Sequence, residues 1–341
     1  MGSNSPRERF YVFTYPRTGS NLLTHLLALD DQPNVASNAE GTRFFLPLQL
    51  LRLKHQCLGA LAPALPYHQR AEQEKCLTDC FNRLLQHLDT AERDGKIVCF
   101  KDHAHYIIEP TAEARLLSGE QSAVDDAPWT LIGPNKLEQT RIGRSDLNET
   151  LFSDDFLKTW KPVFLIKHPA AAFPSFYRAL VNAAGREFVE SDRGWRFYQK
   201  AMSLRWVYKL YHFYLEHFRS PGQYSTDDQL PWPIIVEADD IITQPAILVK
   251  ICQIIGLESS RLRFTWDKMC SDESPGVQAF RKTLFESTAI DPSRAVGDVD
   301  LEKESIKWRE EFGDEIGCRI ETHVREAMPD YVFLKSMRLQ V

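Results

Sequence analysis

Apolar residues recur along the chain in blocks that alternate between strand spacing and helix spacing. The aromatic and β-branched run from Phe10 to Phe13 favours a buried strand, and the leucines of residues 22–29 recur at helical spacing. Further buried strands are predicted at residues 97–101, at residues 163–166 and within PWPIIVEADDI, residues 231–241. Strands that alternate with helices form a parallel sheet covered on both faces. The pattern therefore predicts an α/β fold, a three-layer sandwich with a central parallel sheet flanked by helices.

The blocks between these strands indicate a single domain over residues 1–341 with two insertions. Residues 44–90 are rich in leucine and mostly helical in pattern, which predicts a helical insertion that forms a wall of the substrate site. Residues 111–150 are rich in Gly, Pro, Asp, Ser and Asn, which predicts an irregular surface insertion. The aromatic spacing of residues 195–218 is typical of a core helix, and the C-terminal residues predict a pair of amphipathic helices.

The string FTYPRTGSNLL, residues 13–23, runs from a strand through a tight turn into a helix. Pro16 and Gly19 interrupt the regular structure, and Ser20 or Asn21 is predicted to cap the helix. Free backbone N–H groups at the positive end of a helix attract anions, and the guanidinium of Arg17 has donors that suit a phosphate or sulfate. The alternative is an ordinary turn with a capped helix. The candidate anion ligands are Arg17, Thr18, Gly19, Ser20 and Asn21.

A Walker A nucleotide loop does not fit this turn. That motif needs a second glycine followed by Lys and Ser or Thr at the start of the helix, where it cradles two phosphates and holds magnesium. Residues 13–23 lack both features and keep one cation before the glycine. The turn therefore suits a single phosphate-like group without a metal.

Composition narrows the class of protein. At 43% hydrophobic and 26% charged residues the chain is typical of a soluble globular protein, and its net charge of −6 argues against nucleic-acid or anionic-membrane partners. Seven cysteines without a C-x-x-C pair indicate reduced thiols rather than a disulfide framework or a zinc site. The start MGSNSPRERF has no apolar targeting segment, and no later stretch approaches the roughly 18 apolar residues of a membrane span. We therefore expect a cytoplasmic protein.

The string TYPRTGSNLL resembles the 5′-phosphosulfate loop of the sulfotransferase superfamily. That loop has the form T-Y-P-K-S-G-T-x-W in cytosolic members and P-R-S-G-T-T-L in other branches. The resemblance implies a P-loop-related sulfotransferase fold and identifies the expected anion as the phosphosulfate of PAPS (3′-phosphoadenosine 5′-phosphosulfate). It extends from residue 10 to about residue 257, where IIVEADDIITQPAILVKICQIIGLE resembles a structural strand and helix of the family.

FKDHAH, residues 100–105, resembles the family's K-T-H segment, in which the histidine is the general base and the lysine supports developing charge. The resemblance assigns these roles to His103 and Lys101, and an unperturbed histidine pKa near 6.5 suits proton removal at neutral pH. His105, two residues further on, is an alternative base. Glu40 is another, since the protein-tyrosine branch of the family has a catalytic glutamate at the corresponding position. Without the resemblance, either histidine fits an ordinary hydrogen-bonded residue.

LIKHPAAAFPSFYRAL, residues 165–180, resembles the segment that holds the 3′-phosphate of PAPS. Lys167 and Ser175 keep the eight-residue spacing of the family's arginine and serine. A lysine retains the charge but not the bidentate fork, which predicts weaker discrimination for the 3′-phosphate. The family's C-terminal R-K-G-x-x-G-D-W segment is not recognisable, although Arg281 and Lys282 offer cations and VGDVD lies further on.

The sequence thus predicts a PAPS-dependent sulfotransferase, an enzyme that moves a sulfuryl group from PAPS to a hydroxyl of a small-molecule acceptor without a metal. Leucine-rich and aromatic walls favour an apolar or aromatic acceptor. One alternative keeps the fold but not PAPS, and catalyses a cyclisation, isomerisation or elimination in a small-molecule pathway. A second is a non-catalytic nucleotide-binding protein. The identity of the acceptor and the oligomeric state are left open by the sequence.

Overall fold

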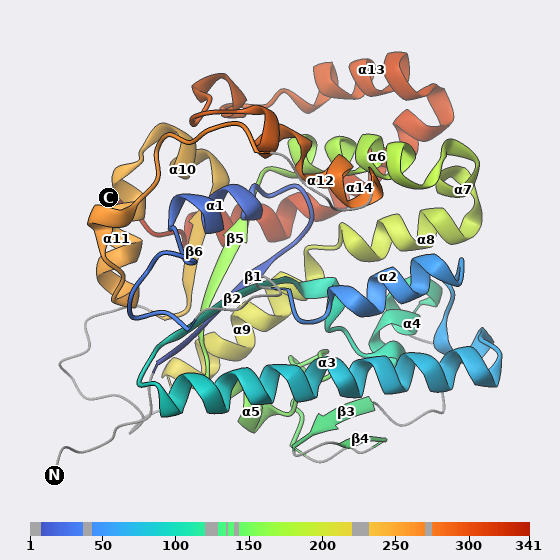
Figure 1. Ribbon diagram of the computed structural model, residues 1–341. Helices are drawn as coiled ribbons and strands as arrows, with labels where there is room; N and C mark the ends of the chain where they lie inside the picture. Colours follow the sequence, from blue (N-terminus) through green and yellow to red (C-terminus); the bar gives the residue numbers. More distant parts are fainter. Residues whose placement is uncertain are drawn as a thin grey trace, which may run out of the picture. The chain divides into compact units, whose positions relative to one another are not determined.

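The centre of the fold is a four-stranded parallel sheet. The computed structural model describes residues 8–36, 43–119, 129–133, 136–139, 143–219, 232–269 and 275–341. The sheet has the strand order β2-β1-β5-β6 (Figure 1). β1 pairs in parallel with β5, so that Phe10 lies opposite Lys161 and Phe13 opposite Phe164. These features confirm the predicted α/β class. The four strands are β1 (Arg9–Thr14), β2 (Val98–His103), β5 (Lys161–Ile166) and β6 (Ile234–Glu237).

Tertiary contacts divide the chain into two compact units, each built from separate segments of sequence. The first comprises the described residues of 1–13, 29–164 and 206–234, and the second those of 14–28, 165–205 and 235–341. The predicted single domain stays a prediction. The first unit contains α2 (Leu46–Lys54), η1 (Ala62–Ala64), α3 (Tyr67–Arg93), η2 (Ala104–Tyr106), α4 (Pro110–Ser118), α5 (Asp154–Lys158), nearly all of α9 (Arg205–Arg219) and the hairpin β3 (Trp129–Ile132) and β4 (Lys136–Gln139).

The second unit is mostly helical. Its helices are α1 (Ser20–Leu26), α6 (Pro169–Ala184), α7 (Arg186–Glu190), α8 (Asp192–Ala201), α10 (Ala238–Thr243), α11 (Ala246–Ile255), η3 (Ser259–Arg261), α12 (Pro275–Glu286), η4 (Pro292–Arg294), α13 (Leu301–Phe312) and α14 (Asp314–Ser336). The last two lie side by side, as predicted for the C-terminal residues (Figure 1). Among the described residues, every helix is too short or too polar to span a lipid bilayer.

An aromatic stack forms the core of the first unit. Tyr11 and Phe13 have ring centroids 3.8 Å apart, although they are two positions apart on one strand and share one face of the sheet. Phe100 of β2 lies 4.1 Å from Tyr11, and Phe164 of β5 lies 5.3 Å from Phe13. All four rings are buried. Each such pair contributes about 0.5–1.5 kcal/mol beyond the burial of its area, so this stack fixes the register of three neighbouring strands.

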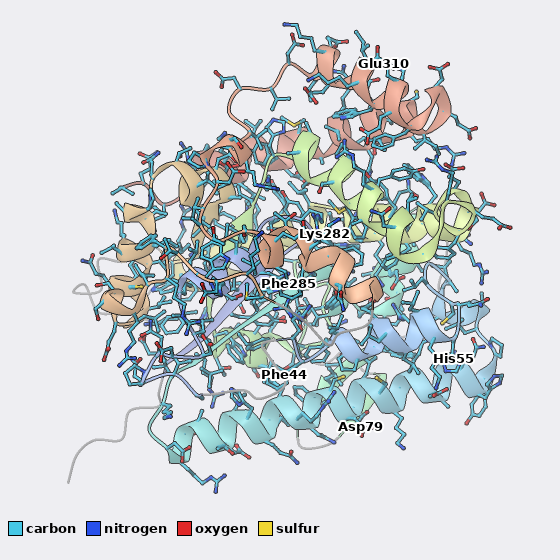
Figure 2. All side chains as sticks on the ribbon, turned by 45° about the horizontal axis from the view of Figure 1, so that its top comes forward. Phe44, His55, Asp79, Lys282, Phe285 and Glu310 are labelled. Atoms are coloured by element: carbon cyan, nitrogen blue, oxygen red, sulfur yellow. The ribbon has the colours of Figure 1, made fainter. Side chains whose placement is uncertain are left out.

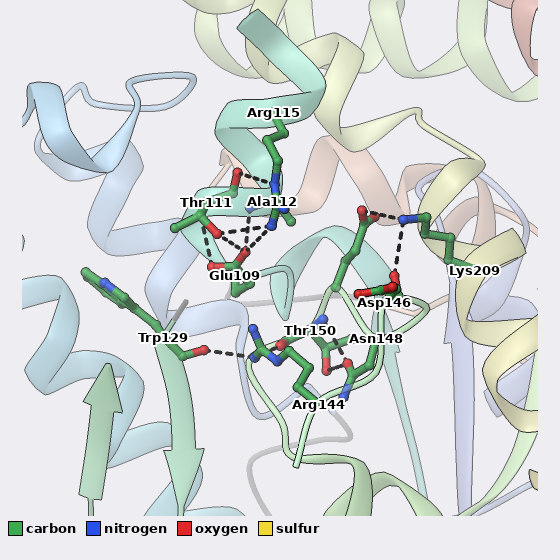
Figure 3. A network of polar contacts seen from close by, with 11 residues as sticks. Glu109, Thr111, Ala112, Arg115, Trp129, Arg144, Asp146, Asn148, Thr150 and Lys209 are labelled. Atoms are coloured by element: carbon green, nitrogen blue, oxygen red, sulfur yellow. Dashed lines mark hydrogen bonds and ion pairs between the residues drawn. The ribbon is translucent and has the colours of Figure 1, made fainter. Parts of the chain in front are cut away.

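Residues 111–150 differ from the irregular surface insertion that their composition predicts. They include most of α4 and the β3–β4 hairpin, and Figure 3 shows a network of polar contacts that several of them form with Glu109 and Lys209. Asn148 is 2% exposed, accepts from the backbone N–H and hydroxyl of Thr150, and donates to the carbonyl of Phe152 and to Asp154. The guanidinium of Arg144 donates to the carbonyl oxygens of Trp129 and Thr150. The polar residues that suggest a surface loop are therefore used as internal hydrogen-bonding partners.

At the junction of α7 and α8, in the second unit, Gly194 lies close to the backbone of Phe188. A Cβ atom there would lie 2.0 Å from the carbonyl oxygen of Phe188, a backbone atom that cannot rotate away. We expect Gly194→Ala to lower the free energy of unfolding by about 1–3 kcal/mol or more, because overpacking forces the backbone to shift. Urea denaturation measures the change. Gly133→Ala is the control, since its Cβ would meet only Leu85 Cδ1 at 3.7 Å, and equal destabilisation by both variants would contradict the prediction.

Candidate functional site

The turn after β1 contains two residues in the left-handed backbone region. Arg17 has a φ of 67° and Gly19 a φ of 79°. For a residue with a side chain this conformation costs about 1–2 kcal/mol, so the fold holds Arg17 in a strained position. Gly19 occupies the N-cap of α1 and supplies no side-chain hydrogen bond. The predicted cap at Ser20 or Asn21 is therefore wrong, because the left-handed glycine starts the helix one residue earlier and both lie inside it.

The five candidate anion ligands of the turn differ in accessibility. Thr18 and Ser20 are buried, and Thr18 Oγ1 donates to the carbonyl oxygen of Tyr15 at 3.0 Å. This bond closes the turn from within, so the hydroxyl proton of Thr18 serves the turn itself. The accessible candidates are Arg17, Gly19 and Asn21.

The hydroxyl of Tyr15 joins this turn to the end of β5. It accepts from the backbone N–H of Lys167 at 2.8 Å and donates to the carbonyl oxygen of the same residue. Burial raises the pKa of Tyr15, and the hydrogen bond to the Lys167 backbone opposes that rise. The hydroxyl therefore stays protonated and both bonds persist. Two segments 152 residues apart in sequence are held together by one side chain.

Arg17 lies against two other elements of the second unit. Its Nε donates to Ser175 Oγ of α6 at 3.0 Å, and its Nη1 donates to the carbonyl oxygen of Phe280 in α12 at 3.0 Å. The structure thus brings together two residues that the sequence assigns to different phosphates, Arg17 and Ser175. Lys167 belongs to the same cluster, because Arg17 lowers its pKa electrostatically.

Lys167, Arg17 and Arg294 form a group of like charges in this unit. Burial lowers the pKa of Lys167; Asp239 and Glu237 oppose this, and Arg17 and Arg294 lower the pKa further. Burial also lowers the pKa of Arg17, and Arg294 adds to that effect. Cations in a partly desolvated place disfavour one another. This group has the charge that a phosphate or sulfate would compensate.

Arg294 was not among the residues that the sequence singled out. It lies in η4, and the loop that follows is fixed by Asp239 Oδ2, which accepts from the backbone N–H of Val296 at 2.8 Å and of Gly297 at 3.0 Å. These two residues begin VGDVD, the string noted in place of the missing C-terminal motif. An arginine two residues before VGDVD was the sequence feature that could have identified Arg294 as a candidate cation.

The two cations that the sequence offers for this C-terminal role each contact a neighbour on α12 itself. The guanidinium of Arg281 stacks over the ring of Phe285, 4.6 Å from its centroid. Lys282 is 71% exposed and lies 3.8 Å from Glu286, one turn along α12. Figure 2 shows Lys282 and Phe285 on this helix. In the structure it is Arg294 that interacts electrostatically with Arg17 and Lys167.

The end of β2, in the first unit, contains the second group of candidate residues. Lys101 and His105 are almost fully buried, whereas His103 is half-buried. The rings of His103 and His105 stack at 5.8 Å with an interplanar angle of 10°, and the ring of Tyr106 lies 5.2 Å from His103. The two histidines thus share one side of the segment, as the sequence suggested. His103 is the more accessible of the pair.

Asp102, between the lysine and the histidine, was missed by the sequence comparison with K-T-H. It is 1% exposed, and its Oδ2 accepts from the backbone N–H of Phe45 at 3.2 Å. Burial raises its pKa to about 7, against the opposing effects of the Phe45 hydrogen bond, Lys101 and Arg43. The carboxyl therefore titrates near neutrality and links β2 to the residues just before α2.

The other candidate base, Glu40, lies outside the described residues. The chain on either side of residues 37–42 is anchored in the first unit, since Val35 forms a parallel bridge with Ile97 and Phe45 binds Asp102. In the part of the chain that the structure describes, no group of three or more His, Cys, Asp or Glu residues could hold a metal ion. The two clusters, around Arg17 and around His103, belong to different units and are described separately.

Comparison with known proteins gives relatives along the whole chain. No family model matches the sequence. The chain is 36% identical over 337 residues to sulfotransferase ppzF of Metarhizium rileyi (strain RCEF 4871), covering 97% of this chain and 96% of that protein. It is also 36% identical over 352 residues to sulfotransferase ppzF of Metarhizium majus (strain ARSEF 297), covering 100% and 99%.

Solved structures with a detectable likeness have low sequence identity. The sulfotransferase domain of the Synechococcus PCC 7002 olefin synthase has a TM-score of 0.40 and 16% identity, over 92% of this chain and 96% of that one. The sulfotransferase domain from the curacin biosynthetic pathway has a TM-score of 0.39 and 17% identity, over 91% and 98%.

Proposed function

The chain belongs to the sulfotransferase family, and we propose that it transfers a sulfuryl group from PAPS to a hydroxyl of a small molecule. The observation that supports PAPS as donor is the cation group of the second unit. Arg17 and Arg294 lower the pKa of Lys167, Asp239 and Glu237 oppose that effect, and the hydroxyl of Ser175 accepts from Arg17 in the same group. A nucleotide with a 5′-phosphosulfate and a 3′-phosphate supplies two anions to such a site.

The contacts of Arg17 suggest how the site changes on binding. Its two hydrogen bonds, to Ser175 Oγ and to the Phe280 carbonyl, occupy donors that a phosphate would compete for. Bonds from a guanidinium to an ionised oxygen are about twice as strong as bonds to a neutral one. We expect the nucleotide to draw Arg17 away from one or both partners, and Ser175 then becomes free to donate to the 3′-phosphate.

The proposed reaction is an in-line displacement at sulfur. A bond forms between the acceptor oxygen and the sulfur as the bond from sulfur to the 5′-phosphate oxygen breaks. His103 takes the acceptor proton, Lys101 stabilises charge that develops near it, and Arg17 neutralises the charge left on the 5′-phosphate. Positioning and charge stabilisation dominate such transfers, so the chemistry needs no covalent enzyme intermediate. The leucine-rich residues 44–90 would line an apolar or aromatic acceptor.

Asp102 favours a second candidate function. A carboxyl with a pKa near 7 beside His103 gives an acid and a base close to one another at neutral pH, which suits proton transfer. With lysine in place of the family's arginine at 167, such a site fits a sulfotransferase-like enzyme that catalyses a cyclisation, isomerisation or elimination without PAPS. Binding of the nucleotide product distinguishes the two functions.

We expect 3′,5′-ADP, the nucleotide product of PAPS, to stabilise the protein by about 2.7 kcal/mol at 100 times its Kd. Arg17→Ala should abolish this stabilisation, because it removes the guanidinium that meets the 5′-phosphate. Thermal unfolding with increasing 3′,5′-ADP measures the effect. Lys282→Ala is the matched control, since this exposed cation contacts only its helix neighbour Glu286 among the ion pairs described. A titration without any shift up to millimolar nucleotide would count against PAPS.

A further inference from the structure

A groove in the first unit lies between α2 and α3 and has a volume of about 830 Å³. One wall is formed by Leu50, Leu51 and Lys54 of α2, and the other by Cys76, Asp79 and Arg83 of α3. At the ends of the two helices, His55 Nε2 lies 3.0 Å from the carboxylate of Glu72. Figure 2 labels His55 and Asp79, which mark the two helices. None of the residues that line the groove belongs to the His103 segment.

A pair of thiols lies at one wall of this groove. Cys76 is half-buried and lines the groove, and Cys80, one helical turn further on, is fully buried. The S–H of Cys80 donates to the sulfur of Cys76, and Arg83 Nη2 donates to the sulfur of Cys80 at 3.4 Å. The Cys80 hydrogen bond lowers the pKa of the Cys76 thiol and Arg83 lowers it further, whereas burial and Asp79 oppose them. The same arrangement raises the pKa of Cys80. Cys76 is therefore the thiol of the pair that a molecule in the groove can reach, and Cys80 is the buried neighbour that favours its thiolate.

The charges of the groove indicate the kind of molecule that reaches Cys76. Three cations, Lys54, Lys75 and Arg83, line it against two carboxylates, Glu72 and Asp79. Lys75 and Arg83 flank Cys76 on α3. A small disulfide with carboxylates at its ends matches these cations, and the apolar wall of α2 suits its aliphatic part.

We propose that Cys76 is a site of reversible S-thiolation by an anionic low-molecular-weight disulfide of the glutathione class, with the α2–α3 groove holding the transferred half. The Cys76 thiolate attacks one sulfur of the disulfide; a bond forms between them and the original S–S bond breaks. The departing thiolate takes a proton from water. Cys76 is oxidised and one half of the disulfide is reduced, so no other oxidant takes part. The proposal is independent of the proposed sulfuryl transfer.

Cys80 does not resolve this mixed disulfide. Side chains four residues apart on a helix have Cβ atoms about 5–6 Å apart, whereas a disulfide needs about 3.5–4.5 Å. An intrahelical bond from Cys76 to Cys80 would therefore distort α3. The mixed disulfide persists until an external thiol removes it.

The experiment incubates the full-length protein with oxidised glutathione and locates the adduct by peptide mass spectrometry. We expect one glutathionyl group on Cys76, removed by dithiothreitol and absent in Cys76→Ser. Cys318→Ser is the matched control, because Cys318 is an exposed thiol on α14 whose loss should leave the adduct unchanged. An adduct on Cys318 or another cysteine, with Cys76 unmodified, would overturn the proposal.

The role of the neighbours is tested by the rate of iodoacetamide labelling at Cys76 against pH. A larger thiolate fraction outweighs the loss of nucleophilicity that accompanies a lower pKa, so Cys76 should react faster at pH 7 in the wild-type protein than in a variant that lacks the Cys80 thiol. Cys80→Ala should shift the pH midpoint of Cys76 labelling upward. If that variant does not fold, Arg83→Met should give the same upward shift through the loss of its charge. An unchanged midpoint and rate of Cys76 labelling in both variants would contradict the inference.

Discussion

Replacing His103 by alanine should slow the chemical step by about 10²- to 10⁴-fold while 3′,5′-ADP binding stays nearly unchanged. That range is the usual contribution of a general acid or base. His103 is the best-placed candidate at the end of β2, because it is half-buried whereas Lys101, Asp102 and His105 are almost fully buried. A base has to reach the acceptor proton, and His103 is the most accessible of these four side chains. Single-turnover kinetics with PAPS and a hydroxyl acceptor measures the step separately from product release.

The two other candidate bases, His105 and Glu40, are tested in the same single-turnover measurement. His105→Gln should have a smaller effect on the chemical step, transmitted through the stacked ring of His103. Glu40→Gln keeps the shape of that side chain and removes its charge. Full turnover in His103→Ala together with loss of turnover in Glu40→Gln would transfer the role of base to Glu40.

Much of the sheet could be predicted from the sequence. The run from Phe10 to Phe13 has a strong strand signal because its aromatic residues stack with neighbouring strands, and β1 begins at Arg9, one residue earlier. Local sequence is informative there, since a buried parallel strand needs apolar side chains on both faces. The polar residues at strand ends were also visible, and Arg17 and Ser175 meet in the structure.

Other features depend on contacts that local sequence does not contain. Residues 111–150 have the composition of a surface loop, but the polar groups of Asn148 and Arg144 are satisfied by backbone atoms inside the fold. Arg294 joins the cation group only because Asp239, more than fifty residues earlier, binds the amides of the loop that follows it. Asp102 has a pKa near 7 because it is buried. The sequence does not indicate this burial, because the residues on either side of Asp102 are polar.

The preference for a 3′-phosphate is the second large effect that we expect. If Lys167 and Ser175 hold this phosphate, the protein should bind 3′,5′-ADP about 10- to 150-fold more tightly than 5′-AMP, which corresponds to a charge-assisted contact of about 1.5–3 kcal/mol. Lys167 is well placed for it, because Tyr15 fixes its backbone and burial weakens competition from water. Isothermal titration calorimetry with both nucleotides measures the ratio.

Variants at the cation group separate the contributions to that ratio. Lys167→Ala should erase most of the preference, and Lys167→Arg should preserve or strengthen it, because a guanidinium restores the bidentate fork of the family's arginine. Arg294→Gln should weaken binding of the doubly phosphorylated nucleotide, since it removes a cation that interacts with both Arg17 and Lys167. Lys282→Ala, on the exposed face of α12, should leave both affinities unchanged. Equal affinities of the wild-type protein for the two nucleotides would mean that the site does not recognise the 3′-phosphate, and a reaction without PAPS would then be the better explanation of this cluster.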